Sequence, residues 1–267
     1  MTLSTAELAA CELANLIGGW RASLGLHPQA RFDRHGSVVW ISSAIDLPFV
    51  NGLITDGPDV APGIIERVVR ELRARGRPFV ARVRVGADDA VASELEQLGM
   101  RERGETLPAM ALHPIGLRDV PVAPGGLDIR RVVDEAGLAD HYAIVVEAFG
   151  LSLEFASGLM PVEALAHESL YVGYVNGEPV ATALTYTGDA TVGVYNVATR
   201  EAWRRRGYGA AITRQAIRAA AAGGATVAIL QSSAAGRGVY ESLGFREVMR
   251  YRILVDAAGD GRDGSPA

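Results

Sequence analysis

Three consecutive arginines, Arg204–Arg206, run directly into Gly207-Tyr208-Gly209 and then into an alanine-rich segment whose composition favours a helix. Backbone N–H groups at the start of a helix lack intrahelical acceptors and carry partial positive charge. Glycine has no Cβ, so a bulky anion can approach the backbone there, and the arginines add cationic donors. The stretch therefore predicts a cradle for a phosphate or pyrophosphate group.

Other interpretations of this stretch fit it to different degrees. A dinucleotide-binding loop needs glycine at the last position of G-x-G-x-x-G, where this chain has Ile212. A mononucleotide P-loop needs Gly-Lys-Ser/Thr, which does not follow here. A solvated arginine run beside two turn glycines stays open as the alternative without a ligand.

The segment Arg204–Ala210 resembles the Q/R-x-x-G-x-G/A motif of the GCN5-related N-acetyltransferase (GNAT) superfamily. In that family the loop binds the pyrophosphate of acetyl-CoA through backbone amides. The segment SAAGRGVYESLGF, residues 233–245, is similar to the family's N-x-x-A-x-x-x-Y-x-x-x-G-F segment. The chain departs from it at Ser233, where the family often has an asparagine that contacts the cofactor. The resemblance covers about the second half of the chain.

The resemblance implies direct transfer of an acetyl group from the thioester of acetyl-CoA to a neutral amine. The pantetheine would lie between two diverging strands, expected at 191–198 and 225–232. Backbone N–H groups near Val197 would polarise the thioester carbonyl. Tyr240 would protonate the departing thiolate, and a core position on a short helix is the alternative for this tyrosine. The implied acetyl-CoA-binding residues are Val197, Ala198, Thr199, Arg204, Arg205, Arg206, Gly207, Tyr208, Gly209, Ala210 and Ser233.

The general base is not determined by the sequence. Family members often place a glutamate on the strand before the loop, but residues 191–198 read TVGVYNVA and contain no carboxylate. Asn196 is the catalytic candidate on this strand, as a residue that can hold a water but is not a strong base. Segments that usually line the acceptor cleft contain Glu147, Glu154, His167, Glu168, Tyr186 and Tyr195. We expect the first four to be solvated or structural, and the tyrosines to shape the pocket or pack in the core.

The elements that must position these residues follow from hydrophobic periodicity and turn residues. In the second half we predict strands at 127–132, 191–198, 225–232 and 245–254, helices at 134–149 and 234–244, a further helical region at 151–167, and a hairpin over 169–189 that turns at Asn176-Gly177. The helix after the arginines extends to about Ala222. This order of elements matches the GNAT fold.

In the first half we predict helices at 4–18, 64–76 and 88–100, and strands at 38–44, 78–85 and 106–112. Ser4 and Glu7 have capping-box spacing at the start of the first helix. Gly18-Gly19 is expected to end that helix.

The two halves share a signal at long spacing. Asn51 precedes Leu98-Gly99 by the same distance as Asn196 precedes Leu243-Gly244, although coincidence stays the alternative. When the two halves are aligned on these residues, Arg204–Ala210 aligns with Asp59–Ile65, and Tyr240 aligns with Leu95. The first loop has no arginine, contains a negative aspartate, and contains a proline without an amide donor. We therefore expect a degenerate first copy without its own acetyl-CoA, which packs against the active copy and completes the acceptor cleft.

The sequence thus predicts an α/β (α+β) GNAT fold in two tandem copies, each with a mixed, mostly antiparallel sheet flanked by helices. Residues 1–112 would form the degenerate GNAT-like domain and residues 127–256 the catalytic GNAT domain. Residues 113–126, rich in proline and glycine, would form the linker. Residues 257–267 are expected to be a disordered tail.

Composition excludes several other classes of protein. A chain of 267 residues with 49% hydrophobic residues can bury a substantial core. A net charge of −5 argues against a general nucleic-acid binder. No stretch approaches the roughly 20 apolar residues of a membrane span. The single cysteine, Cys11, excludes an intrachain disulfide and fits a reducing cytoplasm. The histidines are scattered, so no metal site is expected.

The function expected from the resemblance is acetyl-CoA-dependent N-acetylation, with acetyl-CoA as co-substrate and a small-molecule or peptide amine as the unidentified acceptor. Neither a nucleic acid nor a membrane is expected as a partner, and a homodimer is left open. Two alternatives remain at this point. The first is a non-catalytic acyl-CoA-binding or regulatory module, and the second is an acyltransferase that uses another acyl-CoA or another acceptor.

Overall fold

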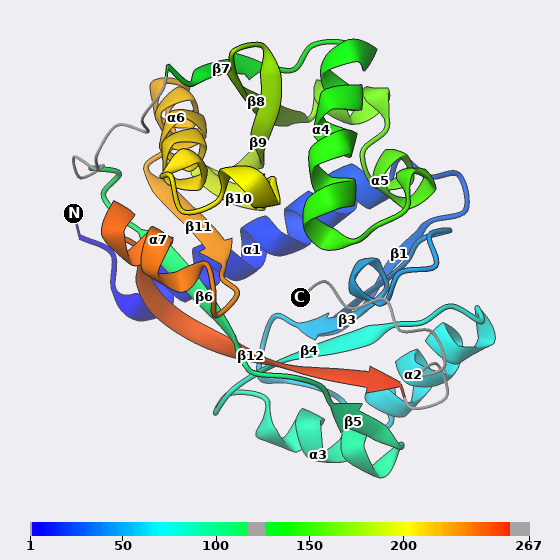
Figure 1. Ribbon diagram of the computed structural model, residues 1–267. Helices are drawn as coiled ribbons and strands as arrows, with labels where there is room; N and C mark the ends of the chain where they lie inside the picture. Colours follow the sequence, from blue (N-terminus) through cyan, green and yellow to red (C-terminus); the bar gives the residue numbers. More distant parts are fainter. Residues whose placement is uncertain (1, 117–125, 257–267) are drawn as a thin grey trace. The chain divides into compact units, whose positions relative to one another are not determined.

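The computed structural model of the chain describes residues 2–116 and 126–256 (Figure 1). Most of the predicted linker and all of the predicted tail lie outside the described residues. The described chain divides into two compact units. Of the described residues, the large unit contains 2–19, 109–116 and 126–248, and the small unit contains 20–108 and 249–256.

The sheet of the large unit has the strand order β6-β11-β10-β9-β8-β7. All neighbouring strands in it are antiparallel except β10 and β11, which are parallel. The strands are β6 (Leu107–Leu112), β7 (Asp128–Arg131), β8 (Glu168–Val175), β9 (Glu178–Gly188), β10 (Thr191–Thr199) and β11 (Val227–Gln231). The helices are the first part of α1 (Thr5–Leu24), α4 (Glu135–Phe149), α5 (Leu153–Leu159), η2 (Val162–Ala166), η3 (Glu201–Trp203), α6 (Tyr208–Ala222) and α7 (Arg237–Leu243).

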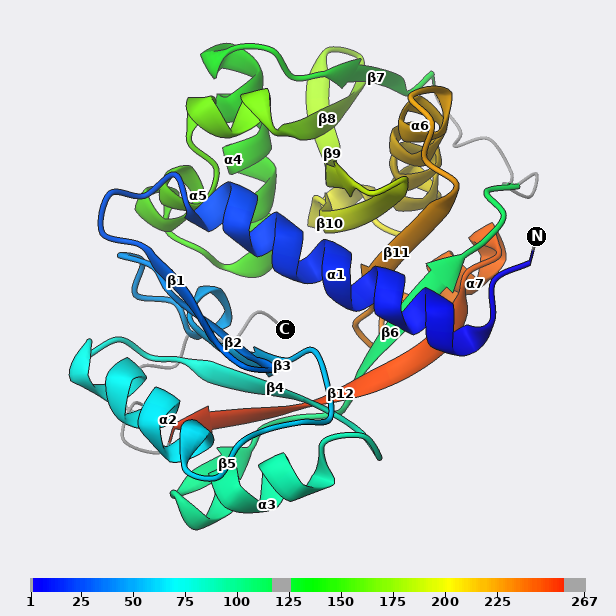
Figure 2. The same ribbon diagram turned by 180° about the vertical axis from the view of Figure 1, so that it is seen from behind.

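Helices cover both faces of this sheet (Figures 1 and 2). Val227 and Ile229 of β11 pack against Leu8 of α1. Ala228 and Leu230 of β11 belong instead to a cluster with Ile217 of α6. Because successive residues of a strand point to opposite faces, α1 and α6 lie on opposite sides of the sheet. The large unit is therefore a mixed α/β structure with a mostly antiparallel sheet flanked by helices, as predicted.

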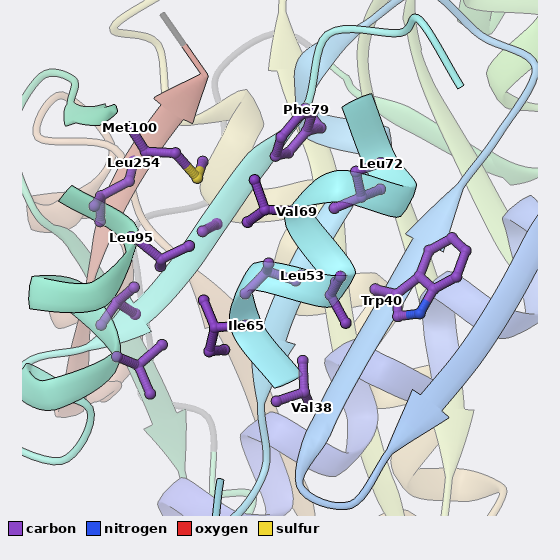
Figure 3. Packing of buried hydrophobic residues seen from close by; sticks show 14 of the residues in the cluster. Val38, Trp40, Leu53, Ile65, Val69, Leu72, Phe79, Leu95, Met100 and Leu254 are labelled. Atoms are coloured by element: carbon purple, nitrogen blue, oxygen red, sulfur yellow. The ribbon is translucent and has the colours of Figure 1, made fainter. Parts of the chain in front are cut away.

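The small unit has the strand order β1-β2-β3-β4-β12, and β5 also pairs with β12. Only β3 and β4 are parallel. Its elements are β1 (Arg31–His35), β2 (Val38–Ser42), η1 (Pro48–Val50), β3 (Gly52–Thr55), α2 (Ile64–Ala74), β4 (Val80–Arg84), α3 (Asp89–Gln97), β5 (Met100–Glu102) and most of β12 (Arg246–Asp256). Side chains from α2, α3 and the sheet meet in one core, in which Trp40 and Leu95 are almost fully buried (Figure 3).

The division into units differs from the predicted domain boundaries at two strands. β6, the last described strand of the first half, pairs along β11 of the large unit, with Ala111 opposite Ile229. β12, the last described strand of the second half, pairs along β4 of the small unit, with Ile253 opposite Arg82. Each half of the sequence therefore gives its final strand to the other unit. The first helix also belongs to the large unit as far as Gly19.

The first helix begins as predicted but ends later. The Ser4 N–H donates to Glu7 Oε2 at 2.8 Å, and the Glu7 N–H donates to Ser4 Oγ at 3.2 Å, which confirms the capping box. The prediction that Gly18-Gly19 ends the helix is wrong, because α1 continues to Leu24. A Cβ at Gly18 would lie 3.0 Å from the Tyr186 hydroxyl oxygen. These glycines therefore allow close packing against β9, rather than ending the helix.

The remaining elements agree with prediction to within a few residues, and the short strands β1, β3 and β5 were not predicted. The hairpin of β8 and β9 turns at Asn176-Gly177, whose φ values of 52° and 83° suit a tight two-residue turn. Within the described ranges, no helix has both the length and the apolar character needed to cross a bilayer.

Candidate active site

The parallel ladder between β10 and β11 ends before either strand does. Thr191–Gly193 pair with Val227–Ile229, whereas β10 continues to Thr199 and β11 to Gln231. The sheet is therefore open between these strands beyond their last pair. Strand edges that are not paired with each other leave backbone donors and acceptors for a ligand.

A bulge in β10 lies directly beyond the end of this ladder. The register between β10 and β9 shifts between Tyr195 and Ala198, so Asn196 and Val197 together stand opposite one residue of β9. Asn196 is exposed and takes a left-handed φ of 49°. Bulges redirect the backbone of a strand and are frequent beside active sites. The catalytic candidate Asn196 and the binding candidates Val197 and Ala198 thus lie at the opening.

A buried histidine of α4 fixes β9 behind the bulge. The Thr182 hydroxyl donates to the Tyr171 carbonyl at 2.9 Å, so it accepts from His141 Nδ1, also at 2.9 Å. This arrangement assigns His141 the tautomer with its proton on Nδ1. Burial lowers the pKa of His141 to about 4, so the ring is neutral at physiological pH. Thr182 pairs with Ala198, which places this bridge next to the bulge.

Arg200 anchors the start of the loop that connects β10 to α6. Its Nε donates to Glu147 Oε2 at 2.6 Å and its Nη1 to Glu178 Oε1 at 3.0 Å. The backbone N–H of Glu201 donates to Glu147 Oε1 at 2.9 Å. The hydrogen bond from Arg200 lowers the pKa of the Glu147 carboxyl, which keeps it charged. The end of α4 and the start of β9 are thereby joined to the residues that precede the arginines.

The three arginines of the loop are all exposed, but they differ in their contacts. The Nε of Arg204 donates to the carbonyl oxygen of Thr199 at 3.1 Å, so this side chain folds back onto β10. The guanidinium of Arg206 lies 5.1 Å from the ring centroid of Trp203. Arg205 has a left-handed φ of 61°, and its side chain makes no hydrogen bond or ion pair within the described part of the chain. Of the three guanidinium groups, that of Arg205 therefore has the fewest contacts within the described residues.

The start of α6 suits an anion. Gly207 precedes the helix with φ 81° and ψ 3°, no side-chain hydrogen bond caps the helix, and its first turn has no acidic residue. A Cβ at Gly209 would lie 3.5 Å from Thr199 Oγ1, so the end of β10 is close to the first turn. Tyr208 is buried against Ile212, so its phenol is turned into the core. Only the backbone of Tyr208 can serve the predicted cradle.

Tyr240 of α7 is partly buried beside Phe245, with the ring centroids 6.1 Å apart. Burial raises the pKa of its phenol to about 12. Its hydroxyl makes no hydrogen bond within the described residues, which leaves both its donor and its acceptor capacity for a ligand. Three predicted site residues, Val197, Ala210 and Tyr240, pack against the same cluster of buried side chains. The bulge, the first turn of α6 and α7 therefore border the same part of the core of the large unit.

Ser233 precedes α7 and has a local structural contact. Its Oγ accepts the backbone N–H of Gly236 at 3.2 Å, which leaves the hydroxyl proton for another partner. The neighbouring Ser232 donates its Oγ to the Ser233 carbonyl at 2.8 Å. A Cβ at Gly236 would lie 3.1 Å from the Tyr240 ring, so this turn and the tyrosine are in contact.

The residues that were candidates for the acceptor cleft differ in their exposure and in their contacts. Glu147 has the structural role at Arg200 described above, and Glu154 and His167 are exposed. Glu168 is buried, with 4% of its surface exposed. The hydroxyl of Tyr195 donates to Asn15 Oδ1 at 2.7 Å, and Tyr186 covers the two glycines of α1.

The polar residues of α1 that face the sheet were not predicted from the sequence. Asn15 and Glu12 are buried, and Asn15 contacts β10 whereas Glu12 contacts β11. They follow Leu8 at the spacing of one helix face, with Gly19 next in the same series. Buried polar residues in an otherwise apolar helical stripe are the signal that could have identified them.

The small unit contains a second strand–helix–strand–helix–strand series. The order β3, α2, β4, α3, β5 repeats the order β10, α6, β11, α7, β12, with a parallel first pair of strands in each. Gly63 precedes α2 with φ 76° and ψ −2°, almost the same conformation as Gly207 before α6. The structural equivalent of Gly207 is therefore Gly63. The alignment of the two halves by sequence instead placed Pro62, one residue earlier, at this position.

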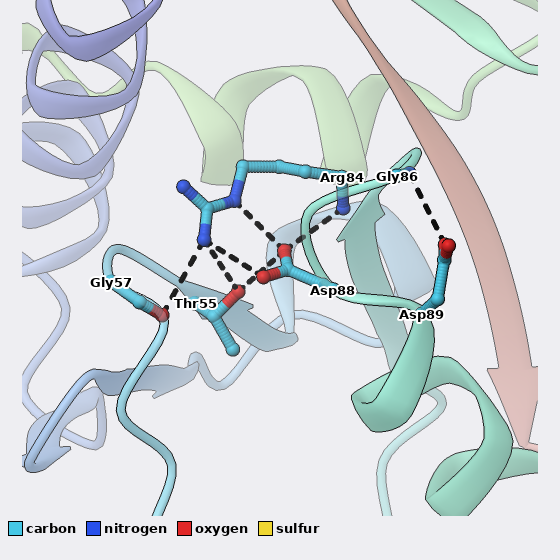
Figure 4. Close-up of polar contacts among 6 residues, drawn as sticks. All are labelled: Thr55, Gly57, Arg84, Gly86, Asp88 and Asp89. Carbon is cyan, nitrogen blue, oxygen red and sulfur yellow. Dashed lines mark hydrogen bonds and ion pairs between the residues drawn. The ribbon is translucent and has the colours of Figure 1, made fainter.

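The second loop nevertheless differs from the first at the ends of its strands (Figure 4). Arg84, the last residue of β4, donates from Nε and Nη2 to the carboxylate of Asp88, each at 2.8 Å. Asp88 also accepts the Thr55 hydroxyl at 2.6 Å, and Thr55 is the last residue of β3. The ends of the two parallel strands are thus bridged by side chains. In the large unit, the corresponding ends of β10 and β11 are not paired.

Residues 166–247 match a family model described as acetyltransferase (GNAT) domain. That span includes β8 to α7, and hence the bulge, the arginine loop and Tyr240. A search of curated proteins finds no match.

Among solved structures, the chain is similar to a GCN5-related N-acetyltransferase from Kribbella flavida, with 25% identity and a TM-score of 0.70 over 91% of this chain and 95% of that one. It is also similar to a GCN5-related N-acetyltransferase from Sphaerobacter thermophilus, with 19% identity and a TM-score of 0.61 over 95% and 93% of the two chains. A tandem GNAT protein from the clavulanic acid biosynthesis pathway matches with 11% identity and a TM-score of 0.61 over 96% and 97%. The last two likenesses establish the fold.

Proposed function

We propose that this chain, whose residues 166–247 match the GNAT acetyltransferase domain model, transfers an acetyl group from acetyl-CoA to a primary amine. The observation that carries the proposal is the early end of the ladder between β10 and β11. The bulge, the start of α6 and α7 all contact one buried cluster, through Val197, Ala210 and Tyr240. An opening with backbone donors on one side and an anion cradle beside it suits an extended thioester that ends in a pyrophosphate.

The proposed reaction joins the amine nitrogen to the acetyl carbon and breaks the bond from that carbon to the CoA sulfur. Negative charge develops on the thioester oxygen during the attack, and the amine loses a proton. Backbone N–H groups near Val197 would stabilise that charge, and donors fixed in a bulge need little reorganisation. The exposed Asn196 would hold a water that receives the amine proton.

The leaving thiolate is the proposed partner of Tyr240. A thiol has a pKa of about 8.5, whereas burial raises the pKa of Tyr240 to about 12. A phenol so much less acidic than a thiol does not give up its proton fully to the thiolate. Tyr240 would instead remain protonated and donate a hydrogen bond to the sulfur as the bond breaks, which lowers the barrier to departure.

The pyrophosphate of acetyl-CoA is proposed to lie at the start of α6. The first N–H groups of a helix and its dipole attract an anion, and no acidic side chain in this first turn opposes it. Arg205 would add a mobile cation, because Arg204 and Arg206 already contact Thr199 and Trp203. Ser233 would contact the cofactor through its remaining hydroxyl proton.

Two measurements test the proposal on the full-length chain. Calorimetric titration with acetyl-CoA measures binding, and a thiol reagent measures CoA release with spermidine, benzylamine, glycine and a peptide with a free N-terminus. Binding with release in the presence of at least one amine is the expected result. Binding without release favours the acyl-CoA-binding module, and absence of binding contradicts both. Mass spectrometry of the product identifies which of these amines has been acetylated.

For the small unit we propose a role without acetyl-CoA of its own. The bridge of Arg84, Asp88 and Thr55 supports this, because it joins the strand ends that would have to part around a pantetheine. A cytoplasmic location and the absence of nucleic-acid and membrane partners remain part of the proposal.

A further inference from the structure

The two strands at the opening each present one residue to α1 directly beyond the last ladder pair. That pair is Gly193 with Ile229. Because alternate residues of a strand share a face, the next residues on the same face are Tyr195 of β10 and Gln231 of β11. Ile229 packs against α1, which identifies this face as the one that α1 covers. Tyr195 and Gln231 are therefore the first side chains on this face after the strands part.

Asn15 of α1 holds the β10 side of the opening. Its Oδ1 accepts the hydroxyl of Tyr195 at 2.7 Å, and its Nδ2 donates to the Thr191 carbonyl at 2.8 Å. A longer contact of 3.4 Å joins Nδ2 to the Tyr186 carbonyl of β9. Burial raises the pKa of Tyr195 far above its ordinary value, so the phenol stays protonated as the donor. One amide side chain thus fixes β10 immediately before its bulge.

Glu12 of α1 holds the β11 side. The Gln231 side-chain amide donates to the Glu12 carboxylate, and Glu12 is completely buried. Residues three positions apart lie on the same face of a helix, so Glu12 and Asn15 face the sheet together. A single helix therefore contacts both strands at the point where they separate.

Gly193 provides independent support for this arrangement. A Cβ at this position would lie 2.1 Å from Asn15 Oδ1 and 2.5 Å from the Tyr195 hydroxyl oxygen. A carbon atom does not come this close to a nonbonded oxygen atom, so any side chain at Gly193 would displace the bridge. The last paired residue of β10 is thus one that leaves room for Asn15 to reach Tyr195.

We infer that Asn15 and Glu12 are positioning residues for the proposed acetyl transfer, because they set the opening between β10 and β11 from the far side of the sheet. The inference rests on the proposed function, and it gives the N-terminal helix α1 a role in the active site of the large unit. Neither residue touches the thioester. They act through Tyr195 and Gln231, whose strands carry the proposed oxyanion donors and one wall of the pantetheine gap. Loss of either contact would let the gap change width while the pyrophosphate cradle at α6 stays in place.

The test uses four full-length variants. Asn15→Leu and Tyr195→Phe each remove the bridge on the β10 side. Ala14→Leu changes an exposed neighbour on α1 and is the control for the first. Tyr174→Phe is the control for the second, because it removes another tyrosine hydroxyl bond of 2.7 Å in the same unit, to Asp140. Each protein is measured for kcat and KM with acetyl-CoA and the best amine of the panel, and for backbone amide exchange by mass spectrometry.

The positioning role predicts that Asn15→Leu and Tyr195→Phe lower kcat by about tenfold to a hundredfold, the range that a displacement of about 1 Å can cause. The KM for acetyl-CoA should stay unchanged, because the cradle is intact. Amide exchange should become faster within 191–199 and 227–231 but not within 208–222. The two controls should match the wild type in every measurement.

Two results would overturn the inference. One is wild-type kcat and exchange in Tyr195→Phe, the milder variant, which is expected to fold. The other is a loss of kcat matched by Tyr174→Phe, which would reduce the effect to general stability. A wild-type chain that releases no CoA with any amine contradicts the proposed function separately, and amide exchange then decides whether α1 sets the opening.

Discussion

Gly207 and Gly63 occupy equivalent positions in the two units. Each precedes a helix that follows the first strand of a parallel pair, and their φ values are 81° and 76°. The residues before them differ: Arg204–Arg206 stand before the first glycine, and Val60-Ala61-Pro62 before the second. The same backbone turn therefore occurs in both units, whereas arginines precede it only in the large unit.

This relationship predicts one acetyl-CoA per chain. Arg205→Glu should weaken acetyl-CoA binding by about tenfold, or ~1.4 kcal/mol, because it replaces the least committed cation of the loop with an anion. Arg218→Glu, an equal charge change on the exposed side of α6, is the control. Calorimetric titration measures stoichiometry and affinity together. A stoichiometry of two, or equal affinities for the two variants, would contradict the assignment of the cradle.

Tyr240→Phe should lower kcat by up to about a hundredfold and leave acetyl-CoA affinity unchanged. The reason is that the hydroxyl serves the departing sulfur and has no other partner in the described residues. Because burial raises the pKa of Tyr240 to about 12, the wild-type rate should show no loss from tyrosine ionisation near pH 10. Rates measured from pH 7 to 10.5 check both points. An unchanged kcat in the variant would remove Tyr240 from the mechanism.

Glu147→Gln should weaken acetyl-CoA binding a few-fold. The substitution keeps the side-chain shape but removes the charge that holds Arg200 and the Glu201 amide before the arginine loop. The pair is about one-third exposed, so screening limits its contribution to roughly 1 kcal/mol or less. Glu154→Gln, at an exposed position on α5, is the control. Affinity that is equal in the two variants, at low and at moderate salt, would show that the anchor does not act on the cradle.

The arginine loop and the order of elements were predictable, because glycines, arginines and hydrophobic periodicity act locally. The bulge at Asn196 was not, since a register shift depends on the neighbouring strand as well as on β10. The exchange of β6 and β12 was missed for the same reason. A strand pattern shows that a segment will pair, but it does not identify the partner.

The role of α1 needed tertiary information of another kind. Gly18-Gly19 has the composition of a helix stop, and the sequence alone supports that interpretation. Only the position of Tyr186 against the helix shows that close packing, not termination, accounts for the pair. Asn15 likewise acquires its role from Tyr195, which lies far away in the sequence.

Asp88→Ala should destabilise the small unit by about 3 kcal/mol, since it leaves Arg84 partly buried without its carboxylate. Acetyl-CoA affinity should not change, because the bridge closes the copy that we propose to be empty. The double variant Arg84→Met/Asp88→Leu should lose less stability than Asp88→Ala, as it leaves no unpaired charge. Denaturant unfolding and titration with acetyl-CoA provide the two measurements. Weaker binding in a folded Asp88→Ala protein would argue against separate roles for the two units.

His141 should make the stability of the chain depend on pH between 6.5 and 4. Burial lowers its pKa from 6.5 to about 4, so the folded state keeps the ring neutral while the unfolded chain takes up a proton. The resulting stability is complete above pH 6.5 and is lost as the pH falls through this window, by about 3 kcal/mol in total. His141→Gln can still donate a hydrogen bond to Thr182 but does not titrate. Its loss of stability between pH 7 and pH 4 should therefore be smaller than that of the wild type by about 3 kcal/mol. His167→Gln, at an exposed position, should behave as the wild type. Comparing each variant with the wild type at both pH values cancels the carboxylates that titrate in the same range, and parallel losses in all three proteins would refute the buried neutral histidine behind the bulge.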